Sequence, residues 1–491
     1  MQSKKRIIAD SVKKNLLYQS SYQLLSLVLP FITAPYIARV LGTAGTGIYS
    51  YANSVMYFFL MVANLGISNY GNREIASCID DNEKLSAKFW GIYYCHAFIT
   101  FLCIISYCIY VPLFVKSFKD AFLWQSFQLI ATLFDITWFF AGIQRFKITV
   151  IRNFVIRAFT VCAIFIFIKS SDDVWKYLLI LSFGNFIGQI VVWSQLKQYV
   201  HFVRFNLKNV LVHLKPMLIL FVPIIAMSIY RYMDKVMIPE LSDVSELGLY
   251  ENSEKIVSLP LSLITTIGVV LLPKMSNIVS KGDVKETNKY FNVAMKYSLI
   301  LALGLTAGLA GVSPVFAPVF FGDEFRKCGE LIPLLAITVV LLTVSNSIRA
   351  QYLIPNKLEH VFIIAAFSGA FINLVINFLL IPKYGSKGAV IATIVTECIV
   401  SVIHIGFTIK KIQFRTIFIN SVPFIIPSVI MLVFVRIIGT VFGERVFTIV
   451  IQVLLGGIFY LLSAGIILRM QKDSYFISLV TNVLKRTGLK C

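Results

Sequence analysis

The sequence predicts an all-α membrane protein that crosses the bilayer about 14 times. Two observations lead to this fold class. Of the 491 residues, 58% are hydrophobic and only 14% are charged, and the apolar residues are gathered in long runs. A helix needs roughly 20 apolar residues to span a bilayer, and these runs reach that length. Soluble domains of this size have neither the composition nor the runs.

The predicted spans follow one another with short connections, none of which is long enough for a folded domain outside the membrane. No cleavable signal is expected, because the first apolar run is long enough to span. The spans are expected at residues 16–38, 45–68, 89–112, 119–142, 150–168, 175–196, 216–238, 250–272, 293–316, 330–354, 361–381, 388–409, 419–438 and 446–468.

Lys and Arg are distributed unevenly between the two sides of the membrane. The connections on the side of the N-terminus carry about three times as many basic residues as the opposite ones. Basic connections stay in the cytoplasm, so both termini are predicted to be cytoplasmic. The net charge of +21 then faces the anionic headgroups of membrane lipids. Nucleic acid is therefore not expected as a partner.

Cysteine and histidine show no pattern typical of metal ligands. The eight cysteines are scattered, most of them inside apolar runs, and no CxxC pair is present. Neither a metal site nor a disulfide framework is indicated. A P-loop is also absent from the sequence, and no cofactor is expected.

Two stretches about 200 residues apart indicate an internal repeat. Residues 27–55 and 220–256 each begin with a proline-bearing span and reach a Gly-aliphatic-Tyr connector followed by Asn-Ser. The matching groups are Gly47-Ile48-Tyr49 with Asn53-Ser54, and Gly248-Leu249-Tyr250 with Asn252-Ser253. Six spans per repeat, in the same orientation, are typical of transporters with a binding site between two lobes.

The repeat predicts two six-helix lobes in a pseudo-twofold arrangement. We expect an N-lobe at residues 1–200 and a C-lobe, with a leading cytoplasmic linker, at residues 201–412. Two extra C-terminal helices and a basic cytoplasmic tail follow at residues 413–491. The glycine-rich stretch at 304–311 is predicted to be a helix-packing face.

The seventh and eighth spans carry charges at or near membrane depth. Arg231, Asp234 and Lys235 lie at helical spacings of three and four, so they share one face. Lys255 follows in the eighth span. Charged residues inside a membrane usually face a water-filled interior and mark a transport path. The alternative is that the lysines lie near helix ends and extend to the interface.

Two segments resemble a known family. Residues 15–76, NLLYQSSYQLLSLVLPFITAPYIARVLGTAGTGIYSYANSVMYFFLMVANLGISNYGNREIA, resemble the start of Wzx-type polysaccharide flippases, relatives of the multidrug (MATE) exporters and lipid II flippases. Residues 230–260 resemble the seventh and eighth spans of that family. The resemblance implies alternating access and an undecaprenyl-pyrophosphate-linked oligosaccharide as cargo. It also implies a location in the bacterial cytoplasmic membrane.

A diphosphate cargo requires cationic groups that replace water around its oxygens, and arginine suits this task because it stays charged and binds two phosphate oxygens at once. The candidate substrate-binding residues are Arg39, Arg157, Arg231, Asp234, Lys235 and Lys255. The alternative for Arg157 is a structural ion pair with Asp135 on the neighbouring span.

Energy for transport is expected from an ion gradient or from downhill exchange, because no nucleotide motif is present. Glu397 lies near the middle of the twelfth span, and His404 follows two turns later on the same face. The ion-coupling candidates are Glu397, His404 and Asp135. The alternative for Glu397 is a structural hydrogen bond to Thr393 or a neighbouring helix.

The sequence distinguishes between three classes of function. The resemblance favours a flippase for capsule, exopolysaccharide or O-antigen-type synthesis, working as a monomer with a polysaccharide polymerase and other assembly proteins as partners. An ion-coupled multidrug exporter is the alternative, with an acidic or apolar binding site. A membrane-bound polymerase or ligase would need a large outer loop, and the outer connections are about 13 residues or shorter. The chain is therefore not expected to be an enzyme.

Overall fold

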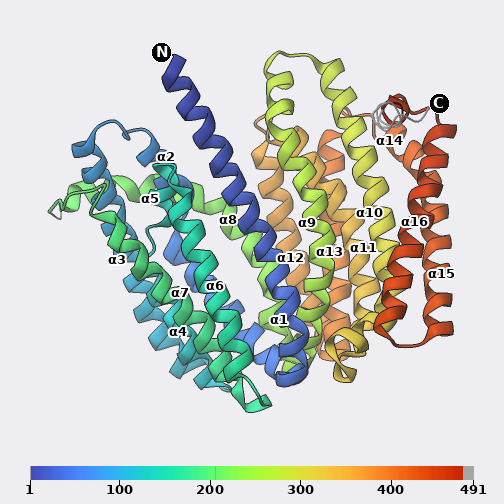
Figure 1. The fold of residues 1–491 in the computed structure, drawn as a ribbon, viewed down its shortest axis with the longest axis horizontal. Coiled ribbons are helices and arrows are strands. Elements are labelled where there is room, and N and C mark those ends of the chain that lie inside the picture. The colour runs from blue at the N-terminus through green and yellow to red at the C-terminus, as the bar shows by residue number, and fades with distance from the viewer. Residues whose placement is uncertain (1, 205, 479–480, 482–491) are drawn as a thin grey trace. The chain divides into compact units, whose positions relative to one another are not determined.

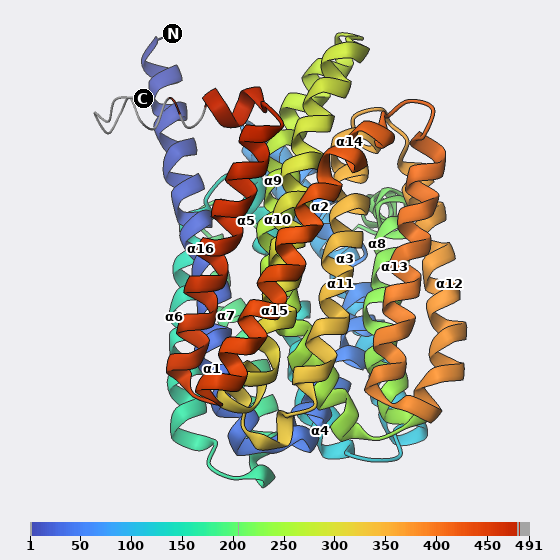
Figure 2. The ribbon, with the colours of Figure 1, turned by 90° about the vertical axis from the view of Figure 1, so that its right-hand side faces the viewer.

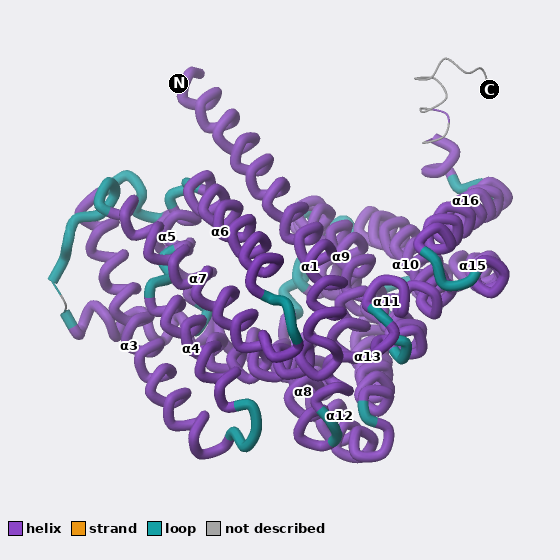
Figure 3. Tube along the Cα trace, turned by 60° about the horizontal axis from the view of Figure 1, so that its bottom comes forward, coloured by secondary structure: helices purple, strands orange, loops and turns teal. Residues whose placement is uncertain are grey.

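The computed structural model describes residues 2–204, 206–478 and 481, and these ranges contain helices and no strand (Figures 1 and 3). The fold class predicted from the sequence is confirmed to this extent. The chain divides into two compact units, residues 1–248 and 249–491. The predicted lobe boundaries near residues 200 and 412 stay a prediction.

The first unit is built from helices that vary greatly in length. They are α1 (Gln2–Asn64), α2 (Ile67–Ala76), α3 (Asn82–Phe114), α4 (Lys119–Leu133), α5 (Thr137–Gly142), α6 (Phe146–Phe167), α7 (Val174–Leu196) and α8 (Leu207–Leu241). Between α7 and α8, residues 197–204 and 206 are not helical, and the linker between the lobes stays a prediction. The long α8 packs against α1, α2 and α3.

The second unit begins inside α9 and contains the C-terminal helices. They are α9 (Val244–Ser280), α10 (Val284–Phe321), α11 (Cys328–Ile348), a π-helical turn (Arg349–Leu353), α12 (Glu359–Tyr384), α13 (Ser386–Thr408), α14 (Phe414–Ser421), α15 (Ile425–Phe442) and α16 (Val446–Met470). Most of the predicted basic tail after residue 478 lies outside the described residues.

In the described part of the chain, 11 helices are long and apolar enough to cross a membrane. The protein is therefore a multi-pass membrane protein. The difference from the roughly 14 predicted spans has local causes. The first two spans form the single helix α1, α4 has only 15 residues, and α8 includes residues whose side chains are not described. The larger number and the orientation of the termini stay predictions.

Gly42 separates the first two predicted spans within α1. Its φ of 68° and ψ of −174° interrupt the helix. A positive φ strains any residue with a Cβ atom, so glycine allows the chain to reverse here without that cost. The position agrees with the predicted connection between residues 38 and 45.

Helices α15 and α16 lie side by side and pack against α10 (Figure 2). Glycine residues of α10 allow this close contact. A Cβ atom on Gly304 would lie 2.3 Å from the Tyr460 ring, and one on Gly311 would lie 2.9 Å from Val435. The Tyr460 hydroxyl donates to the Ile300 carbonyl at 2.5 Å. The predicted helix-packing face at 304–311 is confirmed. Small residues let helices approach closely in this way.

A reciprocal contact joins the two connectors that the sequence repeat equates. A Cβ atom on Gly47 would lie 1.9 Å from the Val244 carbonyl oxygen, and one on Gly248 would lie 2.0 Å from the Thr43 carbonyl oxygen. Gly47 therefore contacts Val244, which lies four positions before Gly248. In the same way, Gly248 contacts Thr43, which lies four positions before Gly47. The backbones touch here because neither position carries a side chain.

We expect that Gly47→Ala lowers the thermal stability of the purified protein. The added methyl group meets a backbone carbonyl that cannot rotate away, and overpacking of this kind costs about 1–3 kcal/mol. Thermal unfolding in detergent measures the effect. Gly457→Ala on α16 is the matched control, since a Cβ atom there meets nothing within 4 Å. Equal melting temperatures for both variants would contradict the contact.

Candidate functional site

The predicted charges of the seventh span lie on α8 beside an aromatic pair. The rings of Tyr57 on α1 and Tyr232 on α8 are stacked, with centroids 3.8 Å apart and planes 17° apart. The Tyr57 hydroxyl also lies 3.3 Å from the Ser228 hydroxyl. Further along the same two helices, Tyr51 bonds to Glu240. These contacts fix α8 against the second half of α1.

Two of the predicted cations flank this aromatic pair. The guanidinium carbon of Arg231 lies 5.9 Å from the centre of the Tyr232 ring, and the Lys235 Nζ lies 5.6 Å from it. Arg231 is exposed and Lys235 is half-buried. A cation near an aromatic face is stabilised by about 0.5–1 kcal/mol at an exposed site. We call Tyr57, Ser228, Arg231, Tyr232 and Lys235 the α8 cluster.

The other predicted substrate-binding residues lie outside the α8 cluster. Asp234 is on α8 but is buried, with 3% of its surface exposed. Arg39 is exposed in the part of α1 before Gly42, and Arg157 is half-buried on α6. Lys255 is on α9 in the second unit, where its Nζ lies 3.3 Å from the Glu251 carboxylate. The structure thus brings Arg231 and Lys235 together around one ring.

Asp135 has a local structural role. Its carboxylate accepts hydrogen bonds from the backbone N–H of Thr137 at 2.8 Å and from the Thr137 hydroxyl at 2.6 Å. The hydrogen bonds described for this carboxylate thus fix the start of α5, and the alternative that pairs it with Arg157 finds no support in them. Side-chain oxygens often satisfy the free N–H groups of a helix start in this way.

Arg152 on α6 has no distinctive sequence pattern around it, although its guanidinium connects two helices. Its Nη1 donates to the Gln189 side chain on α7 at 2.8 Å, and its Nη2 donates to Asn153 at 2.6 Å. The tyrosines of the α8 cluster were missed as well. Aromatic residues are frequent along the whole chain, so sequence gave no signal to distinguish these two from the rest.

Both ion-coupling candidates on α13 are buried in the second unit. Glu397 is 2% exposed and His404 is 1% exposed. The His404 Nδ1 lies 2.8 Å from the Ser345 hydroxyl on α11. The His404 ring lies near the Phe362 ring. The guanidinium carbon of Arg349 lies 5.1 Å from the centre of the Phe362 ring. Arg349 opens the π-helical turn, a distortion that is frequent at functional sites.

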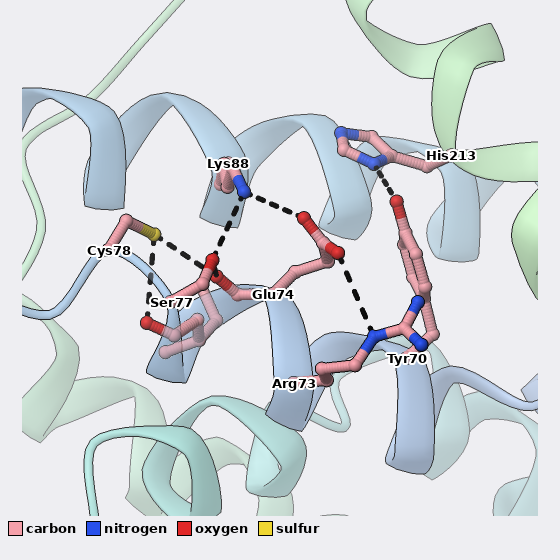
Figure 4. A network of polar contacts seen from close by, with 8 residues as sticks. Tyr70, Arg73, Glu74, Ser77, Cys78, Lys88 and His213 are labelled. Atoms are coloured by element: carbon pink, nitrogen blue, oxygen red, sulfur yellow. Dashed lines mark hydrogen bonds and ion pairs between the residues drawn. The ribbon is translucent and has the colours of Figure 1, made fainter.

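A polar network holds the short helix α2 against α3 and α8 (Figure 4). The Lys88 Nζ lies 2.6 Å from the Glu74 carboxylate, and the Tyr70 hydroxyl lies 2.7 Å from the His213 Nδ1. The Cys78 thiol donates to the Glu74 carbonyl at 3.2 Å, and burial raises the pKa of this thiol. A raised pKa keeps the thiol protonated and unreactive, so this network is structural.

Comparison with known proteins identifies relatives along most of the chain. The model of a family described as polysaccharide biosynthesis protein matches residues 12–279. The putative O-antigen transporter of Shigella dysenteriae is 23% identical over 79% of this chain and 98% of its own length. The putative O-antigen transporter of Escherichia coli strain K12 is 22% identical over 81% of this chain and 96% of its own length.

Solved structures with a similar fold are transporters too. The lipid II flippase MurJ in an inward closed conformation covers 93% of this chain and 100% of its own, with a TM-score of 0.75 and 17% identity. An inward-facing multidrug resistance MATE family transporter covers 78% of this chain and 97% of its own, with a TM-score of 0.60 and 10% identity. These named relatives are transporters and flippases rather than enzymes, as predicted.

Proposed function

The chain belongs to the polysaccharide biosynthesis protein family, and on that premise we propose that it is a flippase for lipid-linked oligosaccharides. Its cargo is an undecaprenyl-pyrophosphate-linked repeat unit, which it translocates across the bacterial cytoplasmic membrane by alternating access. The product serves the synthesis of a capsule, exopolysaccharide or O-antigen-type polysaccharide. A polysaccharide polymerase and other assembly proteins are the expected partners.

The observation that carries this proposal is the match to the two putative O-antigen transporters, which extends over at least 96% of their length. A lipid-linked glycan has a diphosphate between lipid and sugar. The α8 cluster offers that group a guanidinium and an ammonium, both positioned at one aromatic ring. Charge-assisted hydrogen bonds to phosphate are among the stronger ones in proteins.

An ion-coupled multidrug exporter is the alternative function. A fold similar to MurJ and to a MATE transporter does not separate the two, because one fold hosts many functions. The exposed Arg231 of the α8 cluster distinguishes better between a flippase and a multidrug exporter. A binding site for cationic drugs would gain from carboxylates and would lose from Arg231 and Lys235, since like charges repel.

We expect that replacing both cations of the α8 cluster reduces export. Loss of one hydrogen bond to a charged group costs about 1.5–3 kcal/mol, which is about tenfold or more in affinity. Arg231→Ala with Lys235→Ala should therefore leave lipid-linked oligosaccharide in the inner leaflet of a complemented deletion strain. Mass spectrometry of the extracted lipids measures the accumulation and identifies the glycan.

The matched control for this experiment is Arg204→Ala, since Arg204 is exposed in the connection between α7 and α8. Wild-type export by the double variant would remove the α8 cluster from the substrate path. A deletion strain that accumulates no lipid-linked oligosaccharide, but becomes sensitive to cationic drugs, would favour the multidrug alternative.

Glu397 and His404 are our candidates for ion coupling. A carboxylate and an imidazole that are both buried on one helix can take up and release protons during transport. We expect that Glu397→Gln, which keeps the shape of the side chain, makes export insensitive to an imposed pH gradient. Transport in inverted vesicles measures this dependence.

Glu444→Gln is the control, because Glu444 lies on an exposed loop and pairs with Arg326. Proton coupling through Glu397 would be wrong if the Glu397→Gln variant responded to the gradient as the wild type does. His404→Gln shows whether the imidazole takes part, through the same measurement.

A further inference from the structure

His96 on α3 has a backbone carbonyl oxygen at each of its two ring nitrogens. The side chain is completely buried. Its Nδ1 lies 3.1 Å from the Ala63 oxygen, and its Nε2 lies 2.9 Å from the Thr132 oxygen. A carbonyl oxygen can only accept a hydrogen bond, so each contact requires an N–H on the ring. Neutral imidazole has one N–H, whereas the imidazolium cation has two.

The two carbonyls belong to the C-terminal ends of two different helices. Ala63 is the penultimate residue of α1, and Thr132 is the penultimate residue of α4. The last four carbonyls of a helix have no partner within it, and they carry the negative end of the helix dipole. His96 therefore lies where two negative helix ends converge, an arrangement that favours a cation.

Neither helix continues past this point. Leu65 and Gly66 have φ values of 37° and 74°, which end α1 before α2 begins. After α4, the chain turns at Phe134 and Asp135 before α5. The ring of His96 thus lies beside two breaks, one between α1 and α2 and the other between α4 and α5.

The charges around the ring agree with a cation. Of the elements that contact it, α1 and α4 present backbone carbonyls. Burial opposes the charged form of the ring, whereas the Asp135 carboxylate in the connection after α4 favours it. The Thr132 oxygen also accepts from the Asp135 backbone N–H at 3.0 Å. A neutral ring would still direct a nitrogen lone pair at one of the two carbonyl oxygens, and these two negative groups would repel each other.

We propose that His96 is a proton-binding site of the first unit. With the proton bound, the imidazolium joins the end of α1 to the end of α4. Loss of the proton leaves one N–H, so one of the two helix ends is released. The site is separate from Glu397 and His404, and it does not depend on the identity of the cargo. Proton binding to His96 controls whether the ends of α1 and α4 are held together at the two breaks.

Nitrogen NMR of the full-length protein tests the proton directly. The chain has five histidines, and with ¹⁵N-labelled histidine the His96 signals are assigned by their loss in His96→Gln. At about pH 6.5, the ordinary pKa of histidine, we expect a hydrogen on both ring nitrogens of His96. A ring nitrogen without hydrogen at that pH would overturn the proposal. Because the wild type carries the signal, the test does not depend on the yield of the variant.

Hydrogen exchange tests the consequence for the helix breaks. In His96→Gln, we expect the backbone amides of residues 65–70 and 134–139 to exchange about tenfold faster than in the wild type at acid pH, because the imidazolium is missing. The difference should shrink as the pH rises, since the stability that a bound proton contributes is lost when the wild-type ring deprotonates.

His201→Gln is the matched control, because His201 bonds to the Ser86 hydroxyl at the surface of the same unit. It should keep the wild-type exchange at both breaks. A difference between wild type and His96→Gln that does not change with pH would show a purely structural histidine and would refute the proton site.

Discussion

Inside a membrane every backbone N–H and carbonyl must find a partner within the protein, because no water is available to supply one. Regular helix meets this demand everywhere except at its ends. The breaks in the first unit are therefore the places where polar side chains are needed. Asp135 bonds to Thr137 at the start of α5, and His96 joins the ends of α1 and α4.

Run length and composition were enough to predict an all-helical membrane protein, because the thickness of the bilayer sets the length of each element independently of tertiary contacts. The turn at Gly42 also falls where the sequence predicts a connection. The short helices α2, α5 and α14 were not predicted. They are too short to span. Helices α2 and α14 lie mostly in predicted connections, whereas α5 lies inside the predicted span 119–142, which is broken at residues 134–136.

The candidate site could be predicted only in part. Charge in an apolar run singled out Arg231 and Lys235, because such charges are rare in any sequence that crosses a membrane. Their aromatic partner Tyr57 is distant in the sequence, and only the packing of α1 against α8 brings it close. Asp135 stays a candidate for ion coupling, and its carboxylate bonds to Thr137 two positions away, a pattern common to many turns.

The close approach at Gly47 and Gly248 limits how the two connectors can vary. Each glycine meets the backbone carbonyl at the position that matches the one met by the other. A side chain at either position would press on the backbone of the other connector, so the same restriction to glycine acts at both places.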